Sequence, residues 1–145
     1  PAAIGAKVGR PDKTVWSIAG DGGFQMTMCD RAVAVENNID VKFAILNNGT
    51  LGMVHQWQDL FYERDYFATV YTGNPDFVKL AESYGIRGIR VTEKGEVMGA
   101  IQEAMETPGP VVVDFRVKED ENVYPMIPAG ESVKDMREEP WLDSA

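Results

Sequence analysis

Cysteine and histidine are almost missing from this chain, which holds one of each among its 145 residues. The single cysteine, Cys29, excludes a disulfide within the chain. The single histidine, His55, excludes most zinc sites and Ser-His-Asp pairs of ordinary design. No apolar run approaches the roughly 18 residues that a membrane-spanning helix needs. These shortages favour a protein of a reducing, cytoplasmic environment that lies outside membranes.

Basic residues are also scarce: 14 Lys and Arg stand against 23 Asp and Glu, for a net charge of -9. This balance argues against nucleic acid or an anionic membrane as a partner. A phosphate group bound here would have to be held by a metal ion and backbone dipoles. The 44% hydrophobic and 26% charged residues are ordinary globular values, and the length suits one domain.

The chain opens at Pro1 without an initiator methionine, and its first residues resemble the middle of a helix with no N-terminal cap. We therefore expect a fragment whose upstream part is missing. The cytoplasmic assignment leaves aside any targeting segment in that part.

The order of apolar and polar residues predicts alternating strands and helices. Strands buried on both faces of a parallel sheet are predicted at 14–19 and 41–46, with further strands at 86–91 and 111–117. Helices are predicted at 2–8, 27–36, 52–63, 76–84 and 93–106. This alternation is typical of an α/β doubly wound fold, with a mostly parallel sheet and flanking helices. We assign residues 1–117 to this domain and residues 118–145 to an irregular C-terminal tail.

Individual residues add detail to these predictions. Thr27 is the expected N-cap of its helix, whose apolar positions are Cys29, Ala32, Val33 and Val35. Trp16 is expected to be a buried strand residue, and Trp141 to pack within the tail.

Two short motifs directly follow the first two strands: Gly20-Asp21-Gly22 and Asn47-Asn48. If the strands are parallel neighbours, both motifs reach the same carboxyl edge of the sheet, where ligands of such folds bind. Taken alone, each motif is usually an ordinary turn or loop. Their pairing after two neighbouring strands makes a site for a metal ion and a diphosphate as good an interpretation as two ordinary turns.

Magnesium prefers six oxygen ligands, some of them from phosphates and water. Asp21 offers a carboxylate, Asn48 a carbonyl oxygen, and a backbone carbonyl near Thr50 could complete the protein share. Gly20, Gly22 and Gly23 allow backbone amides to approach the anion. Neither the P-loop pattern nor the G-x-G-x-x-G dinucleotide pattern is present.

This arrangement resembles the signature of thiamine diphosphate enzymes, and the similarity extends to the catalytic subunits of the acetolactate (acetohydroxyacid) synthase family. The segments that carry it are 20–27, 45–54, 56–58, 74–77, 79–81 and 124–128, among which Gly-Met-Val-x-Gln-Trp at 52–57 is the most specific. The resemblance implies a C-terminal thiamine diphosphate-binding domain, truncated at its N-terminus.

By position in that family, Mg²⁺ would be held by Asp21, Asn48 and the Thr50 carbonyl. The implied cofactor-binding residues are Gly20, Asp21, Gly22, Gly23, Asn48, Thr50, Leu51, Gly52 and Met53.

The resemblance also implies that Trp57 and Met53 contact substrate, with Trp57 favouring 2-ketobutyrate over pyruvate. The residues alone favour a different role for both, as core residues of an amphipathic helix. His55 falls at a variable position of the family and receives no role.

The implied reaction joins a two-carbon unit from decarboxylated pyruvate to pyruvate or 2-ketobutyrate, in branched-chain amino-acid biosynthesis. No catalytic residue is expected in this fragment, because the glutamate that activates the cofactor lies upstream in the family, as does the FAD-binding domain. The implied partners are 2-keto acids, further catalytic subunits in a homodimer or homotetramer, and a regulatory small subunit.

Two alternatives stay open. A related thiamine diphosphate enzyme, such as pyruvate oxidase, glyoxylate carboligase or the catabolic acetolactate synthase, would share the site but act on another substrate. A non-catalytic α/β module that binds phosphate is the more distant alternative.

Overall fold

A computed structural model describes residues 1–138 of the chain. Within them the fold is built on a sheet of four parallel strands. The strands are β1 (Val15–Gly20), β2 (Val41–Asn47), β3 (Arg87–Val91) and β4 (Val111–Arg116), in the spatial order β1-β2-β4-β3. The predicted α/β fold with parallel strands is confirmed.

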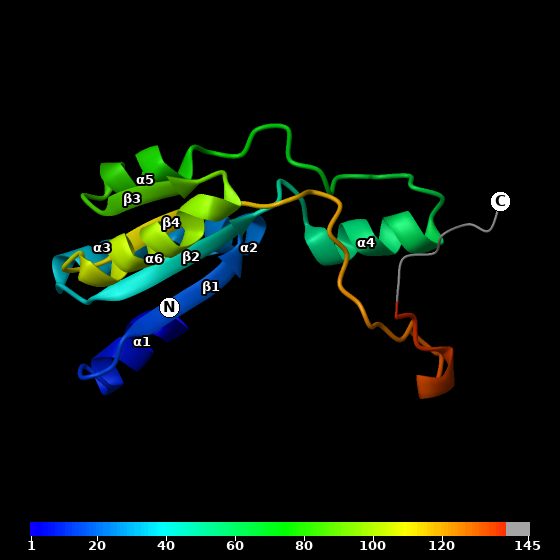
Figure 1. Ribbon diagram of the computed structural model, residues 1–145, viewed down its shortest axis with the longest axis horizontal. Coiled ribbons are helices and arrows are strands. Elements are labelled where there is room, and N and C mark those ends of the chain that lie inside the picture. Colours follow the sequence, from blue (N-terminus) through cyan, green and yellow to red (C-terminus); the bar gives the residue numbers. More distant parts are fainter. Residues whose placement is uncertain (139–145) are drawn as a thin grey trace.

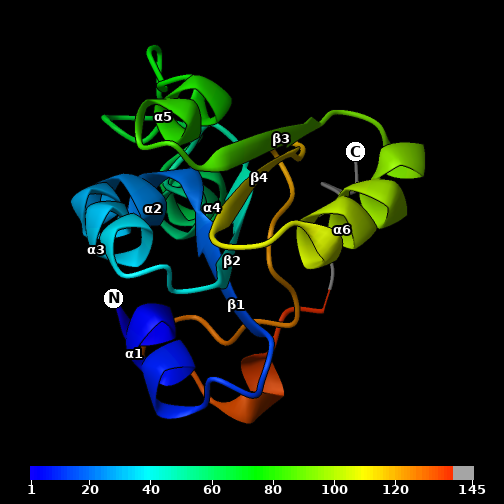
Figure 2. The ribbon, with the colours of Figure 1, turned by 90° about the vertical axis from the view of Figure 1, so that its left-hand side faces the viewer.

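Helices cover both faces of this sheet (Figure 2). One face carries α1 (Ala2–Gly9), α2 (Asp21–Met26), α3 (Arg31–Glu36) and α5 (Phe77–Ser83), and the other carries α6 (Val97–Glu106). A further helix, α4 (Gly52–Phe61), lies beyond the carboxyl ends of the strands (Figure 1). Short 3-10 helices span Met28–Asp30, Lys94–Glu96 and Val133–Asp135.

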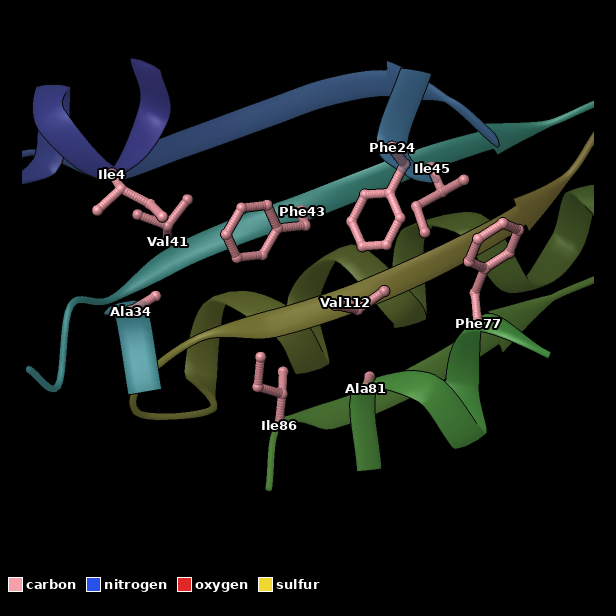
Figure 3. Packing of buried hydrophobic residues seen from close by; sticks show 10 residues of the cluster. All are labelled: Ile4, Phe24, Ala34, Val41, Phe43, Ile45, Phe77, Ala81, Ile86 and Val112. Atoms are coloured by element: carbon pink, nitrogen blue, oxygen red, sulfur yellow. The ribbon is translucent and has the colours of Figure 1, made fainter. Parts of the chain in front are cut away.

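The main core lies between the sheet and the four helices of the first face (Figure 3). Phe24 of α2 packs edge-on against Phe43 of β2 and Phe77 of α5, with ring centroids 6.4 and 5.6 Å apart. A smaller cluster on the opposite face joins Ala100 and Ala104 of α6 to Val111 and Val113 of β4. These contacts fix α2, and with it Asp21, against the sheet.

The single helix predicted at 27–36 is wrong. Helical structure begins earlier, at Asp21, and breaks around Thr27, whose side chain makes no capping hydrogen bond. Cys29, Ala32 and Val33 are exposed, and Val35 is only half-buried. Arg31 is buried instead, because its guanidinium stacks over the rings of Phe24 and Phe43. The helix thus packs on the core partly through the cation–π contact of Arg31, and not through the apolar residues that were predicted to be buried.

The prediction that β1 is buried on both faces is also wrong. β1 is an edge strand, and α6 packs over β3 and β4 rather than over β1. Ile18 is therefore 71% exposed and Trp16 half-buried, and both line an open apolar groove beside α6.

The remaining elements lie close to their predicted places. Asp76 is the N-cap of α5, where its carboxylate accepts hydrogen bonds from the backbone amides of Val78 and Lys79. Gly85 follows that helix at φ +74°, a conformation that suits glycine. From residue 117 to residue 138 the chain is irregular apart from the 3-10 helix at Val133–Asp135 and an antiparallel bridge between Met126 and Arg137, and Trp141 lies outside the described residues. No helix within residues 1–138 is long and apolar enough to cross a membrane.

Candidate functional site

The two motifs meet at the carboxyl edge of the sheet. β1 and β2 are parallel neighbours in which Gly20 pairs with Leu46, so Asp21, directly after β1, and Asn47, the last residue of β2, lie at the same edge of the sheet. Gly49, at φ +75°, turns the chain so that its amide donates to Asp21 Oδ2 over 3.1 Å. The expected neighbourhood of the motifs is confirmed.

Asp21 is a fully buried carboxylate whose two oxygens differ. Oδ2 accepts hydrogen bonds from the Gly49 amide and from Asn74 Nδ2, whereas Oδ1 has no hydrogen-bond partner among the described residues. Asp21 is 0% exposed, and a buried charge left without compensation is costly. The unpartnered Oδ1 therefore fits a cation ligand.

Asn48 and Thr50 line the same cleft as Asp21. Asn48 Oδ1 accepts a 3.2 Å hydrogen bond from the Thr50 amide, which leaves the second lone pair of this oxygen for a metal ion. Thr50 forms an antiparallel bridge with Val70. The two hydrogen bonds of this bridge run from the Leu51 amide to the Thr69 carbonyl and from the Tyr71 amide to the Gly49 carbonyl. The Thr50 carbonyl accepts neither of them.

Within residues 1–138, no group of three or more His, Cys, Asp or Glu side chains could hold a metal ion. A cation here would depend on one carboxylate together with amide and backbone oxygens, a ligand set that suits Mg²⁺ when phosphate and water complete it.

The motifs enclose a cleft of about 430 Å³. Its lining includes all nine residues that the resemblance assigns to the cofactor: Gly20, Asp21, Gly22, Gly23, Asn48, Thr50, Leu51, Gly52 and Met53. The structure thus brings the whole predicted set together, although these residues come from two separate parts of the chain.

Gly22 lines the cleft and packs closely against Tyr71. A Cβ atom at this position would overlap the Tyr71 hydroxyl and press on the Leu51 side chain. Burial, and to a lesser extent the charge of Asp21, raise the pKa of Tyr71, so its hydroxyl stays protonated beside the carboxylate.

Met53 and Trp57 lie on α4, where they are 57% and 37% exposed. Their predicted alternative as core residues is therefore wrong. The buried residues of α4 are His55, which stacks on Tyr66 at 4.2 Å, and Gln56, which exchanges two hydrogen bonds with the backbone of Val123. These polar contacts turn the apolar face of α4 outward.

The outward face of α4 borders an apolar hollow of about 950 Å³. Trp57 packs against Phe61 with ring centroids 5.5 Å apart, and Tyr62 and Phe67 complete the aromatic lining. Met53 lines both this hollow and the cleft of the two motifs, so the two spaces adjoin.

Three parts of the site were missed from the sequence. Asn74 and Tyr71 come from the loop before α5, and the segment after β4 adds Lys118 and Glu121 to the cleft wall. Asn74 begins one of the segments that carried the family resemblance, but nothing in the sequence alone placed it beside Asp21.

Residues 1–115 match the family described as thiamine pyrophosphate enzyme, C-terminal TPP binding domain. The chain belongs to this family. Its cofactor is accordingly thiamine pyrophosphate, also called thiamine diphosphate, and the cleft at the two motifs lies within the matched residues.

Individual relatives within this family are acetolactate synthase large subunits. The acetolactate synthase large subunit of Corynebacterium glutamicum is 51% identical over 142 residues, covering 94% of this chain and 23% of that protein. The acetolactate synthase isozyme 2 large subunit of Escherichia coli is 41% identical over 138 residues, covering 95% of this chain and 25% of that protein. The resemblance to acetolactate synthase catalytic subunits is confirmed.

A solved structure supports the fold. The thiamine diphosphate-dependent 4-hydroxybenzoylformate decarboxylase of Rhodococcus jostii superposes with a TM-score of 0.77 at 32% identity, over 84% of this chain and 23% of that one. The chain thus spans about a quarter of the length of the relatives that it matches.

Proposed function

We propose that this chain is the thiamine diphosphate-binding part of an acetolactate synthase catalytic subunit. The observation that carries the proposal is the buried Asp21, with its unpartnered Oδ1, in a cleft that adjoins the aromatic hollow at Trp57. The similarity to acetolactate synthase large subunits supports the same assignment.

In this proposal Asp21 Oδ1, the Asn48 carbonyl oxygen and the Thr50 carbonyl would hold Mg²⁺, and the backbone amides of residues 20–23 would bind the diphosphate. Bound thiamine diphosphate supplies the nucleophilic carbon for decarboxylation of a 2-keto acid. The chain's own part is to hold the diphosphate end rigidly, since Asp21 and the glycines are fixed by β1, β2 and α2.

The aromatic hollow is the proposed place of the second 2-keto acid. Met53 lines both the cleft and the hollow, and Trp57 and Phe61 offer an apolar wall to the side chain of the substrate. Such a wall distinguishes one methylene by about 1–3 kcal/mol, which is the difference between 2-ketobutyrate and pyruvate.

Further parts of the proposal lie outside this chain. They are the glutamate that activates the cofactor, an FAD-binding domain, a second catalytic subunit and a regulatory small subunit, in a cytoplasmic enzyme. Because these parts are absent from residues 1–145, we expect the isolated chain to have no synthase activity, and robust turnover by it would refute this view.

A related thiamine diphosphate enzyme is the competing proposal, since the decarboxylase of Rhodococcus jostii shares the fold. The test is the product that full-length protein containing this chain forms from pyruvate, with and without thiamine diphosphate and Mg²⁺. We expect acetolactate, formed only when both are present. Release of acetaldehyde or acetate as the main product would favour the competitor, and no product with any 2-keto acid would favour a non-catalytic module.

A further inference from the structure

Asn74 lies outside both motifs, yet it is the side chain that contacts Asp21. The loop between α4 and α5 runs back from α4 to the carboxyl edge of the sheet (Figure 1), and Asn74 is near its end. Its Nδ2 donates to Asp21 Oδ2, and its Oδ1 accepts a 3.0 Å hydrogen bond from Gln25 Nε2. Both ends of this amide are therefore fixed.

Asn47 connects this contact to the interior of the sheet. Its Oδ1 is 3.4 Å from Asn74 Nδ2, and its Nδ2 donates over 2.8 Å to Asp114 Oδ1 of β4. Asn47 is 3% exposed and Asp114 is 0% exposed, so this pair is as buried as Asp21 itself. The first asparagine of the Asn47-Asn48 motif thus faces the interior, while the second faces the cleft.

Two arginines balance the charge of Asp114. Arg116 Nη2 lies 3.1 Å and Arg90 Nε 3.4 Å from Asp114 Oδ2. Arg90 also forms an ion pair with Asp76, the N-cap of α5, which stands two residues after Asn74. The positive charges of this network are therefore engaged at Asp114 and Asp76, and the contacts that reach Asp21 come from neutral groups.

We propose that Asn74 is a positioning residue for the metal ligand Asp21. By holding Oδ2 together with the Gly49 amide, it fixes the rotation of the carboxylate so that Oδ1 points into the cleft. The donor is a neutral amide, so this contact orients the carboxylate without adding a positive charge beside it. The inference rests on the proposed function, in which Asp21 would be a ligand of Mg²⁺.

A charged donor at position 74 would act differently. Lys or Arg beside Asp21 would compensate the buried carboxylate permanently and compete with the cation. A metal ligand needs a partner that orients it without neutralising it, and outer partners of this kind commonly change metal affinity by about 10–100-fold.

The experiment measures, in full-length protein containing this chain, the Mg²⁺ concentration that gives half-maximal thiamine diphosphate binding. Asn74→Ala should raise this concentration by about 10-fold or more. Saturating Mg²⁺ should restore most of the cofactor binding, because the cleft itself is intact. Asn74→Lys should raise the Mg²⁺ requirement further, while its unfolding temperature without metal stays equal to the wild type or increases.

Asn37→Ala is the matched control, because Asn37 Nδ2 donates to the Val33 carbonyl at the end of α3 and touches no residue of the cleft. It should leave the Mg²⁺ requirement unchanged. An Asn74→Ala protein that loses only thermal stability, with the wild-type Mg²⁺ requirement, overturns the inference while the proposed function stands. A wild-type protein that binds thiamine diphosphate without Mg²⁺ overturns the metal site and the inference with it.

Discussion

The floor and the wall of the site are built in opposite ways. The floor, at Asp21 and Asn47, is polar, fully buried and joined by hydrogen bonds across β1, β2 and β4. The wall, at Met53 and Trp57 of α4, is apolar and open to solvent. α4 itself is attached by polar contacts at Gln56 and His55, on the side away from the hollow.

This difference separates two tasks. A metal ion and a diphosphate need ligands fixed to within fractions of an ångström, which a buried network on neighbouring strands provides. A substrate wall needs apolar surface, and exposed aromatic side chains of this size commonly mark a place where a ligand or another chain binds. Changes in the floor should therefore alter cofactor binding, and changes in the wall should alter the choice of substrate.

Asp21→Asn should have the largest effect. It removes the charge of the proposed metal ligand, so Mg²⁺-dependent retention of thiamine diphosphate should fall by more than the roughly 100-fold that loss of an outer partner can cause. Without metal the variant should be as stable as the wild type or more stable, because a buried charge with an unpartnered oxygen has been neutralised.

Calorimetric titration of cofactor with and without Mg²⁺, and thermal unfolding of the metal-free protein, measure the two effects of Asp21→Asn. Asn48→Ala is the companion variant, which removes a neutral ligand and should lower cofactor retention less. Unchanged thiamine diphosphate affinity in both variants would contradict the metal assignment.

Gly22→Ala should have the next largest effect, through packing. Its Cβ would overlap the Tyr71 hydroxyl, and such overpacking costs about 1–3 kcal/mol of unfolding free energy. Gly23→Ala is the matched control on the same helix, where a Cβ meets nothing within 4 Å and alanine favours the helix. Urea unfolding of both variants tests the difference.

Tyr71→Phe provides a second test of that contact. Added to Gly22→Ala, it should recover part of the lost stability, because it removes the hydroxyl but leaves the ring. Equal stability of Gly22→Ala and Gly23→Ala would show that the floor is less tightly packed than the structure indicates.

The sequence was sufficient to predict that the two motifs of the floor lie together, because parallel strands bring their carboxyl ends to one edge of the sheet. Once 14–19 and 41–46 are recognised as neighbouring strands, Asp21 and Asn48 must lie close together, whatever the rest of the chain does. Glycines around a carboxylate then indicate close approach of an anion. The family resemblance extended this pair to the nine residues that line the cleft.

The remaining parts depend on contacts between distant segments. Nothing local to Asn74 indicates that its loop returns to Asp21, and Arg31 is buried only because two phenylalanine rings from other elements cover it. The exposure of Ile18 depends on which face α6 covers, and periodicity within β1 carries no information about that. The same holds for α4, whose apolar spacing is that of a core helix although its polar side is the buried one.

Trp57→Leu should have the smallest effect, confined to the wall. Trp57 is partly exposed and outside the buried clusters, so the unfolding temperature and Mg²⁺ requirement should stay near the wild type. The smaller side chain removes part of the apolar surface offered to the extra methylene of 2-ketobutyrate. The preference over pyruvate should fall by about 10-fold, within the 1–3 kcal/mol that one methylene is worth.

The measurement for Trp57→Leu is the ratio of the two condensation products when both 2-keto acids compete. Tyr62→Leu is the matched control, because Tyr62 lines the same hollow but follows the C-terminal end of α4, farther along the helix from Met53. It should change the ratio less than Trp57→Leu does. An unaltered ratio in Trp57→Leu would remove substrate choice from the wall, and a raised Mg²⁺ requirement in the same variant would show that floor and wall are coupled rather than separate.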